Sequence, residues 1–167
     1  RARILWARCL PYGEGITFWP VAEMVKAAAG IGETDSPEAA RSKLGDLVAA
    51  AEEGAEVAER VASAIGLGEG GGDLQETFWA IRRLLEILAL ETPLVVVVED
   101  IHWAEPGLLD LMQYLARFSA DHPVFILCTS RPEIREFRSD WATVAETAEL
   151  ADVSQPTVIR FCRSLGF

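Results

Sequence analysis

Residues 94–98 are apolar at every position, and two acids, Glu99 and Asp100, follow them directly. A strand in a half-exposed sheet alternates apolar and polar side chains, so four consecutive valines predict a strand covered by helices on both faces. In open α/β sheets, ligands bind at the carboxyl ends of the strands. Glu99 and Asp100 therefore stand where they can hold a hard cation and polarise a water molecule. The alternative is an ordinary buried strand with solvated acids after it.

Two further apolar runs, residues 4–9 and 124–128, predict additional strands. Pro106 begins a predicted helix between the second and third strands, and a strand–helix–strand unit of this kind is parallel and right-handed. Other helices are predicted over residues 19–29, 37–51, 55–65 and 74–90. The second and third of these are rich in alanine and acids, which indicates a solvated helical insertion. The predicted fold class is α/β, with three parallel strands.

Composition limits the possible partners. Half of the 167 residues are hydrophobic, enough for the core of one domain or of a small domain with an appendage. A net charge of −11 repels phosphate backbones, so nucleic-acid binding has to be local. Cys9 and Cys128 belong to apolar strands, and we expect buried free thiols in a reducing cytoplasm. We find no signal peptide and no bilayer-spanning run, and the absence of an initiating methionine suggests a fragment.

The valine run and its two acids, followed by His102-Trp103-Ala104-Glu105, resemble the Walker B element of STAND ATPases. These are AAA-type P-loop signalling proteins found in bacterial transcriptional regulators and beside adenylate cyclase domains. The resemblance implies a partial three-layer P-loop NTPase fold over residues 1–137. It also implies that Glu99 and Asp100 hold Mg²⁺ and act on water in a complete parent that binds ATP. Glu99 departs from the family pattern, in which aspartate is commoner.

Two other stretches resemble the same family. Residues 8–20 are similar to the segment that follows its phosphate-loop helix, and residues 129–133 to its sensor I element. In sensor I an arginine at a strand end faces the terminal phosphate of the nucleotide. The matching residue is Arg131, and the alternative is a solvated surface arginine. His102 is interpreted as a structural or coupling residue, because no second histidine lies nearby in sequence to share a metal ion.

The motif Gly-x-x-x-x-Gly-Lys-Ser/Thr, whose backbone amides wrap the phosphates of ATP, does not occur in the sequence. The glycine-rich residues 66–72 lack its lysine and hydroxyl residue and are interpreted as a flexible connector. In the family, the phosphate loop and its strand lie just before the point where this sequence begins. That strand would lie beside residues 124–128, so we expect an uncovered edge there. We also expect this chain alone to bind nucleotide weakly or not at all.

Residues 139–167 form a second predicted unit. From residue 142 they resemble the helix-turn-helix of RpiR-family sugar-responsive regulators. Ala148 supplies the small residue at the helix crossing, and Asp152 stands at the turn where glycine is usual. Ser154 would cap the second helix, which in this motif enters the major groove of DNA. The motif would be partial, because ATPase-like sequence replaces its expected first helix.

The resemblance implies local DNA contacts from the second helix. The residues expected to make them are Ser154, Gln155, Thr157, Arg160 and Arg163. A helical hairpin that completes the ATPase core is the alternative for this tail.

Three functional hypotheses follow. The first is a fragment of a cytoplasmic bacterial signalling ATPase and transcriptional regulator, inactive as an enzyme without its phosphate loop. The second is a non-enzymatic RpiR-like DNA-binding regulator, and the third is a fusion of two gene fragments without function. We expect no membrane partner and leave a homo-oligomer open.

Overall fold

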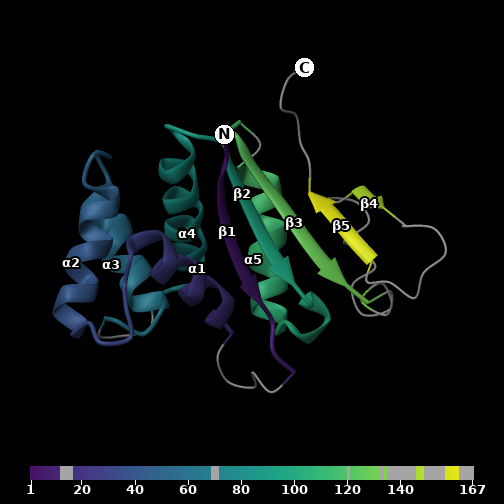
Figure 1. Cartoon of the computed structure of the whole chain (residues 1–167), viewed down its shortest axis with the longest axis horizontal. Helices are drawn as coiled ribbons and strands as arrows, with labels where there is room; N and C mark the ends of the chain where they lie inside the picture. Colours follow the sequence, from purple (N-terminus) through teal and green to yellow (C-terminus); the bar gives the residue numbers. More distant parts are fainter. Residues whose placement is uncertain are drawn as a thin grey trace.

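The structure, a computed structural model, describes residues 1–11, 17–68, 72–119, 121–131 and 134, and the backbone alone of residues 146–148 and 157–161. Its sheet has the strand order β1-β2-β3-β5-β4 (Figure 1). Three of its strands run parallel: β1 (Arg3–Arg8), β2 (Leu94–Glu99) and β3 (Val124–Ser130). The predicted parallel strands are therefore confirmed, with small differences in where they begin and end.

Helices occur where the hydrophobic pattern predicts them. They are α1 (Trp19–Ala29), α2 (Pro37–Val48), α3 (Gly54–Ala64), α4 (Leu74–Ala89) and α5 (Pro106–Phe118). Local chemistry explains several of their ends. Gly30 ends α1 in the left-handed conformation that glycine adopts readily. The side chains of Ser36 and Asp73 accept backbone hydrogen bonds at the starts of α2 and α4.

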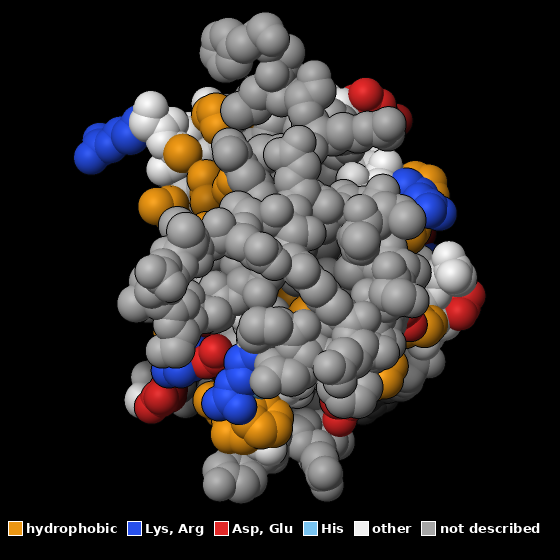
Figure 2. All heavy atoms as spheres, turned by 90° about the vertical axis from the view of Figure 1, so that its right-hand side faces the viewer, with side chains coloured by type: hydrophobic (Ala, Val, Ile, Leu, Met, Phe, Trp, Pro, Cys, Tyr) orange, Lys and Arg blue, Asp and Glu red, His pale blue; other side chains and the backbone are white. Residues whose placement is uncertain are grey.

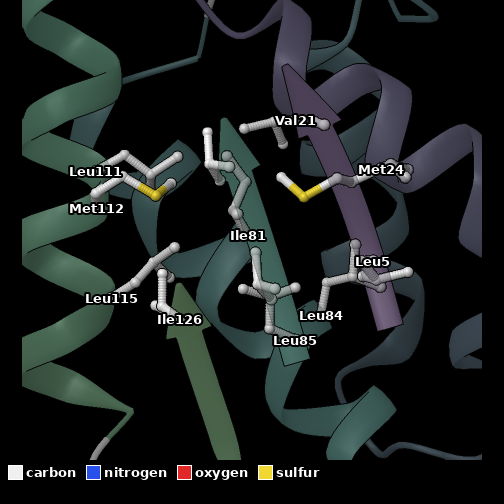
Figure 3. Packing of buried hydrophobic residues seen from close by; sticks show 14 of the residues in the cluster. Leu5, Val21, Met24, Ile81, Leu84, Leu85, Leu111, Met112, Leu115 and Ile126 are labelled. Atoms are coloured by element: carbon white, nitrogen blue, oxygen red, sulfur yellow. The ribbon is translucent and has the colours of Figure 1, made fainter. Parts of the chain in front are cut away.

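The hydrophobic core lies between the sheet and the helices α1, α4 and α5. In Figure 3, Leu5 of β1 and Ile126 of β3 point toward the side chains of these helices, among them Met24, Leu84 and Met112. Helices α2 and α3 pack against α1 and α4 at the side of the sheet (Figure 1). They form the helical insertion that the sequence predicts.

The other face of the sheet carries no helix in the part of the chain that the structure describes, and here our prediction is wrong. Every second side chain of β2 is fully buried, but Val95 and Val97 between them are only half-buried. Their neighbours on β1, Ile4 and Trp6, are 66% and 54% exposed. A strand with apolar side chains on both faces can be buried between two layers of helices. The pattern of β2 alone, however, does not ensure that helices pack on both faces. Within these residues the sheet and helices form two layers, not three.

The prediction of helices in the tail is also wrong for the residues described there. β4 (Glu146–Ala148) and β5 (Thr157–Phe161) are strands, and β5 pairs antiparallel with both β3 and β4. The β-branched and aromatic side chains of residues 157–161 favour a strand over a helix. The edge of β3 offers the backbone donors and acceptors that such a strand pairs with. The edge that we expected to be uncovered is therefore occupied.

This pairing changes the setting of two predicted DNA-contact residues. Thr157 lies opposite Ser130 of β3, and Arg160 lies opposite Leu127. They belong to a sheet and not to a groove-reading helix. The other predicted contacts, Ser154, Gln155 and Arg163, lie outside the described residues, so DNA binding by the tail as a whole stays a prediction.

Glu86 is a buried acid that the sequence analysis did not single out. It lies on α4, is 1% exposed, and pairs with Arg82 at 2.9 Å and with Arg83. Arg83 also pairs with Glu53 at the start of α3, and Nδ1 of His122 lies 3.6 Å from the Glu86 carboxylate. A buried carboxylate is costly unless it has such partners. The network therefore ties α3 and the loop before β3 to α4.

None of the helices in the described ranges has the length and apolar character needed to cross a bilayer.

A matched pair of leucines tests the placement of α4. Leu84 is 1% exposed, whereas Leu90, just past the end of the same helix, is 71% exposed. We expect Leu84→Ala to lower the free energy of unfolding by about 2–5 kcal/mol, because it leaves a cavity in the core. Leu90→Ala is the control and should change it by less than about 0.5 kcal/mol. Urea unfolding followed by far-ultraviolet circular dichroism measures both, and equal effects would contradict the packing of α4.

The buried cysteines allow a second test. Cys9 and Cys128 are free thiols in the core, as predicted. Burial, and secondly the charge of Asp100, raises the pKa of Cys9 to about 12, and burial also raises the pKa of Cys128. Both thiols are then protonated near neutral pH and unreactive toward disulfide reagents. In a Cys162→Ser variant, we expect no labelling of the folded chain and labelling of both thiols in urea. Rapid labelling without urea would contradict their burial.

Candidate functional site at the carboxyl edge of the sheet

The site begins with the register of the parallel strands. Arg8, the last residue of β1, lies opposite Glu99, the last residue of β2. The next residue, Asp100, donates its backbone N–H to Oγ1 of Thr129 on β3 at 3.2 Å. Because parallel strands finish at the same edge, residues far apart in sequence meet here: Arg8, the two acids, and the end of β3 before Arg131.

Asp100 has an unusual backbone conformation. Among the described residues it is the only one other than glycine with a positive φ, at 57°. Aspartate enters this left-handed region more readily than most residues, since its short polar side chain can form local hydrogen bonds. The chain turns sharply at this point into the 3₁₀ helix η1 (Ile101–Trp103), whose Trp103 N–H bonds to the Asp100 carbonyl at 2.9 Å. The turn fixes where the Asp100 side chain leaves the backbone.

The carboxylate of Asp100 is held by Arg8. Nε and Nη2 of Arg8 lie 2.7 and 2.6 Å from the same oxygen, Oδ2 of Asp100. This hydrogen bond, with the charge of Asp100, raises the pKa of Arg8, and the charge of Glu99 acts in the same direction. Sequence analysis missed Arg8 as a site residue. A signal for it was available in the sequence. Arg8 is near the end of the predicted strand 4–9, which is expected to lie beside the strand that precedes the two acids.

Arg131 lies one residue beyond β3 and contacts the turn after β2. Its backbone N–H points to Nδ1 of His102 at 3.4 Å, and its guanidinium carbon lies 5.7 Å from the centre of the Trp103 ring. The rings of His102 and Trp103 are themselves 5.0 Å apart. A basic side chain lying against a hydrophobic one, with acids beside it, is visible at the lower end of Figure 2, toward which β1 to β3 point in Figure 1.

A further contact joins the segment before α1 to this edge. Oγ1 of Thr17 donates to the carboxylate of Glu105, the N-cap of α5. A Cβ atom at the nearby Gly107 would lie 2.8 Å from Cγ2 of Thr17, so glycine permits the close approach. Thr17, shortly before α1, and the N-cap of α5 are therefore in direct contact, although they are 88 positions apart in sequence.

The residues present fit a magnesium ion that a nucleotide shares. No group of three histidine, cysteine or acidic side chains that could hold a metal converges in the described ranges. Mg²⁺, however, is commonly bound through one or two carboxylates, with phosphate oxygens and water completing its shell. Glu99 and Asp100 supply that number of carboxylates, although Arg8 holds one of them. Their roles as ligands and catalytic groups stay predictions.

Comparisons with known proteins agree with this arrangement. The model of the AAA ATPase domain family matches residues 1–127. An uncharacterized protein of Rhizobium meliloti (strain 1021), R02095, is 32% identical over 171 aligned positions, which cover 90% of this chain and 15% of that protein. This chain thus spans about a sixth of the length of that relative. No solved structure matches this chain. Since the family model covers 127 of the 167 residues, including β1, β2 and the first four residues of β3, the chain belongs to the AAA ATPase domain family.

Proposed function

We propose that this chain supplies the metal-holding and phosphate-sensing side of the ATP site in a signalling ATPase of the STAND class. The supporting observation is the register of β1, β2 and β3, by which Glu99, Asp100 and Arg131 share one edge of the sheet. Family membership makes ATP the expected nucleotide. The assignment to the STAND class depends on the motif His102–Glu105 and its contact with Thr17.

Each residue has a distinct part in this proposal. Glu99 and Asp100 would hold Mg²⁺, and Asp100 would also orient the attacking water. A bound Mg²⁺ neutralises charge that develops on the phosphates during transfer. Arg131 would face the terminal phosphate. The cation–π contact with Trp103 supports this role, because it holds the guanidinium near this edge of the sheet while its N–H groups can still donate to phosphate oxygens.

The wider role is that of a regulator. STAND ATPases occur in transcriptional regulators, and the chain corresponds to only 15% of its relative R02095. We infer a cytoplasmic, ATP-controlled switch in which this domain reports the nucleotide state to the rest of a longer protein. DNA binding by that protein and self-association are open parts of the same proposal. By itself the chain is expected to bind ATP weakly, since its sequence contains no Gly-x-x-x-x-Gly-Lys-Ser/Thr loop.

Metal binding tests the two acids. Mn²⁺ can replace Mg²⁺ and is detected through the relaxation of water protons. We expect Glu99→Gln and Asp100→Asn each to weaken Mn²⁺ binding by roughly 10-fold, because each removes an anionic oxygen ligand. Asp110→Asn removes the same charge at an exposed position on α5 and serves as the control. Equal Mn²⁺ affinity in all four proteins would reject the metal site.

Nucleotide dependence tests Arg131. With ATP in large excess, we expect the wild-type chain to bind Mn²⁺ more tightly than without ATP, since phosphate oxygens complete the metal shell. Arg131→Ala should remove most of this enhancement, measured for each protein as the ratio of its Mn²⁺ affinity with ATP to its Mn²⁺ affinity without ATP. Arg117→Ala, an exposed arginine in the last turn of α5, is the matched control. Enhancement that is equal in the two variants would reject the sensor role.

A further inference from the structure

The contact between Arg8 and Asp100 bears on how the proposed metal site is filled. Two N–H groups of Arg8 converge on one carboxylate oxygen, Oδ2, at 2.6 and 2.7 Å. A divalent cation that binds Asp100 needs the lone pairs of the same carboxylate. A cation on either oxygen of this carboxylate would lie close to the guanidinium, and two positive groups at so short a distance repel each other. The guanidinium and the cation are therefore competitors for Asp100.

The charges at the edge lead to the same conclusion. Two arginines stand at the same edge as the acids Glu99 and Asp100: Arg8, which pairs with Asp100, and Arg131, which follows β3 and contacts the turn after Asp100. The formal charges of these four side chains balance, so the two arginines weaken the attraction of Glu99 and Asp100 for a free divalent cation. If Arg8 leaves Asp100, the carboxylate becomes available to the cation and a guanidinium becomes available to the phosphates that accompany it.

The surroundings of the pair allow the side chains to separate without refolding. The Asp100 backbone is held by its N–H bond to Thr129 and by the η1 turn, so only its side chain has to rotate. The Arg8 side chain is 57% exposed and the Asp100 side chain 25%. Ion pairs this exposed contribute little to stability and are screened by salt. The pair is thus strong enough to orient Asp100 and weak enough to exchange.

We propose that Arg8 is a positioning residue that occupies Asp100 in the metal-free state and must release it before a divalent cation, together with its polyphosphate, can bind. This inference rests on the proposed function, because it requires Asp100 to be a metal ligand. The release is an exchange of ionic partners, in which the carboxylate passes from guanidinium to cation. No covalent bond changes.

A double-mutant cycle with Mn²⁺ as the probe tests this exchange in the whole chain. We expect Arg8→Gln to bind Mn²⁺ roughly 2- to 5-fold more tightly than the wild type, the range typical of losing an exposed ion pair. In the Asp100→Asn background the same Arg8→Gln change should give no gain. A gain that persists there would mean that Arg8 acts by general repulsion at Glu99, which would overturn the inference. Arg3→Gln, the same change at the other end of β1, is the control and should leave Mn²⁺ affinity unaltered.

The acid variants distinguish failure of the Arg8 inference from failure of the proposed metal site. If Glu99→Gln and Asp100→Asn weaken Mn²⁺ binding but Arg8→Gln brings no gain, the Arg8 inference fails and the proposed metal site stands. If neither acid affects Mn²⁺ binding, both fail. Arg8→Lys keeps the charge but cannot present two N–H groups in one plane, so it should give part of the gain. Unfolding midpoints in urea for all variants should match the wild type, because the pair is exposed.

Discussion

Parallel pairing among β1, β2 and β3 is the constraint on which the candidate site depends. The register sets Arg8 within bonding distance of Asp100 and places Asp100 beside Thr129, although these two pairs are separated by 92 and 29 positions in sequence. A change of one residue in the pairing of β1 would turn its side chains to the other face of the sheet. The buried Leu5 and Ala7 would then meet solvent, while Ile4 and Trp6 would enter the core. Core packing therefore fixes the register, and the register fixes the site.

The sequence predicts the elements because their signals are local. The valine run gives β2, proline and Ser36 mark the starts of helices, and the periodicity of apolar residues gives the faces of α4 and α5. Two structural features do not follow from local signals. How far one face of a sheet is buried depends on which other segments pack against it. The run of valines therefore does not indicate that Val95 and Val97 are only half-buried. The tail residues could likewise form either the helices of the predicted motif or a strand paired with the free edge of β3. Residues 157–161 form the strand.

The candidate site was predictable to a similar extent. Glu99, Asp100 and Arg131 follow strands that are visible in the sequence, so their common edge follows from parallel topology alone. Arg8 was not recognised, because its role depends on which strand lies beside β2 and on the register between them. The positive φ of Asp100 was also hidden, since nothing in the residue type requires it. Sequence thus identifies the residues at strand ends, whereas the contacts among them require coordinates.

The acidic composition of the chain gives a reason for the arginines at this edge. With a net charge of −11, the molecule as a whole repels nucleotide phosphates. An edge that carried only Glu99 and Asp100 would add to that repulsion whenever no metal ion is bound. The positive charges of Arg8 and Arg131 at the same edge offset those two negative charges. Under the proposed function, a cation and its polyphosphate would bind together, because each would meet an oppositely charged side chain at this edge. The same balance of charges would make either one alone a weak ligand, so the site would respond to the metal–nucleotide complex more than to its separate components.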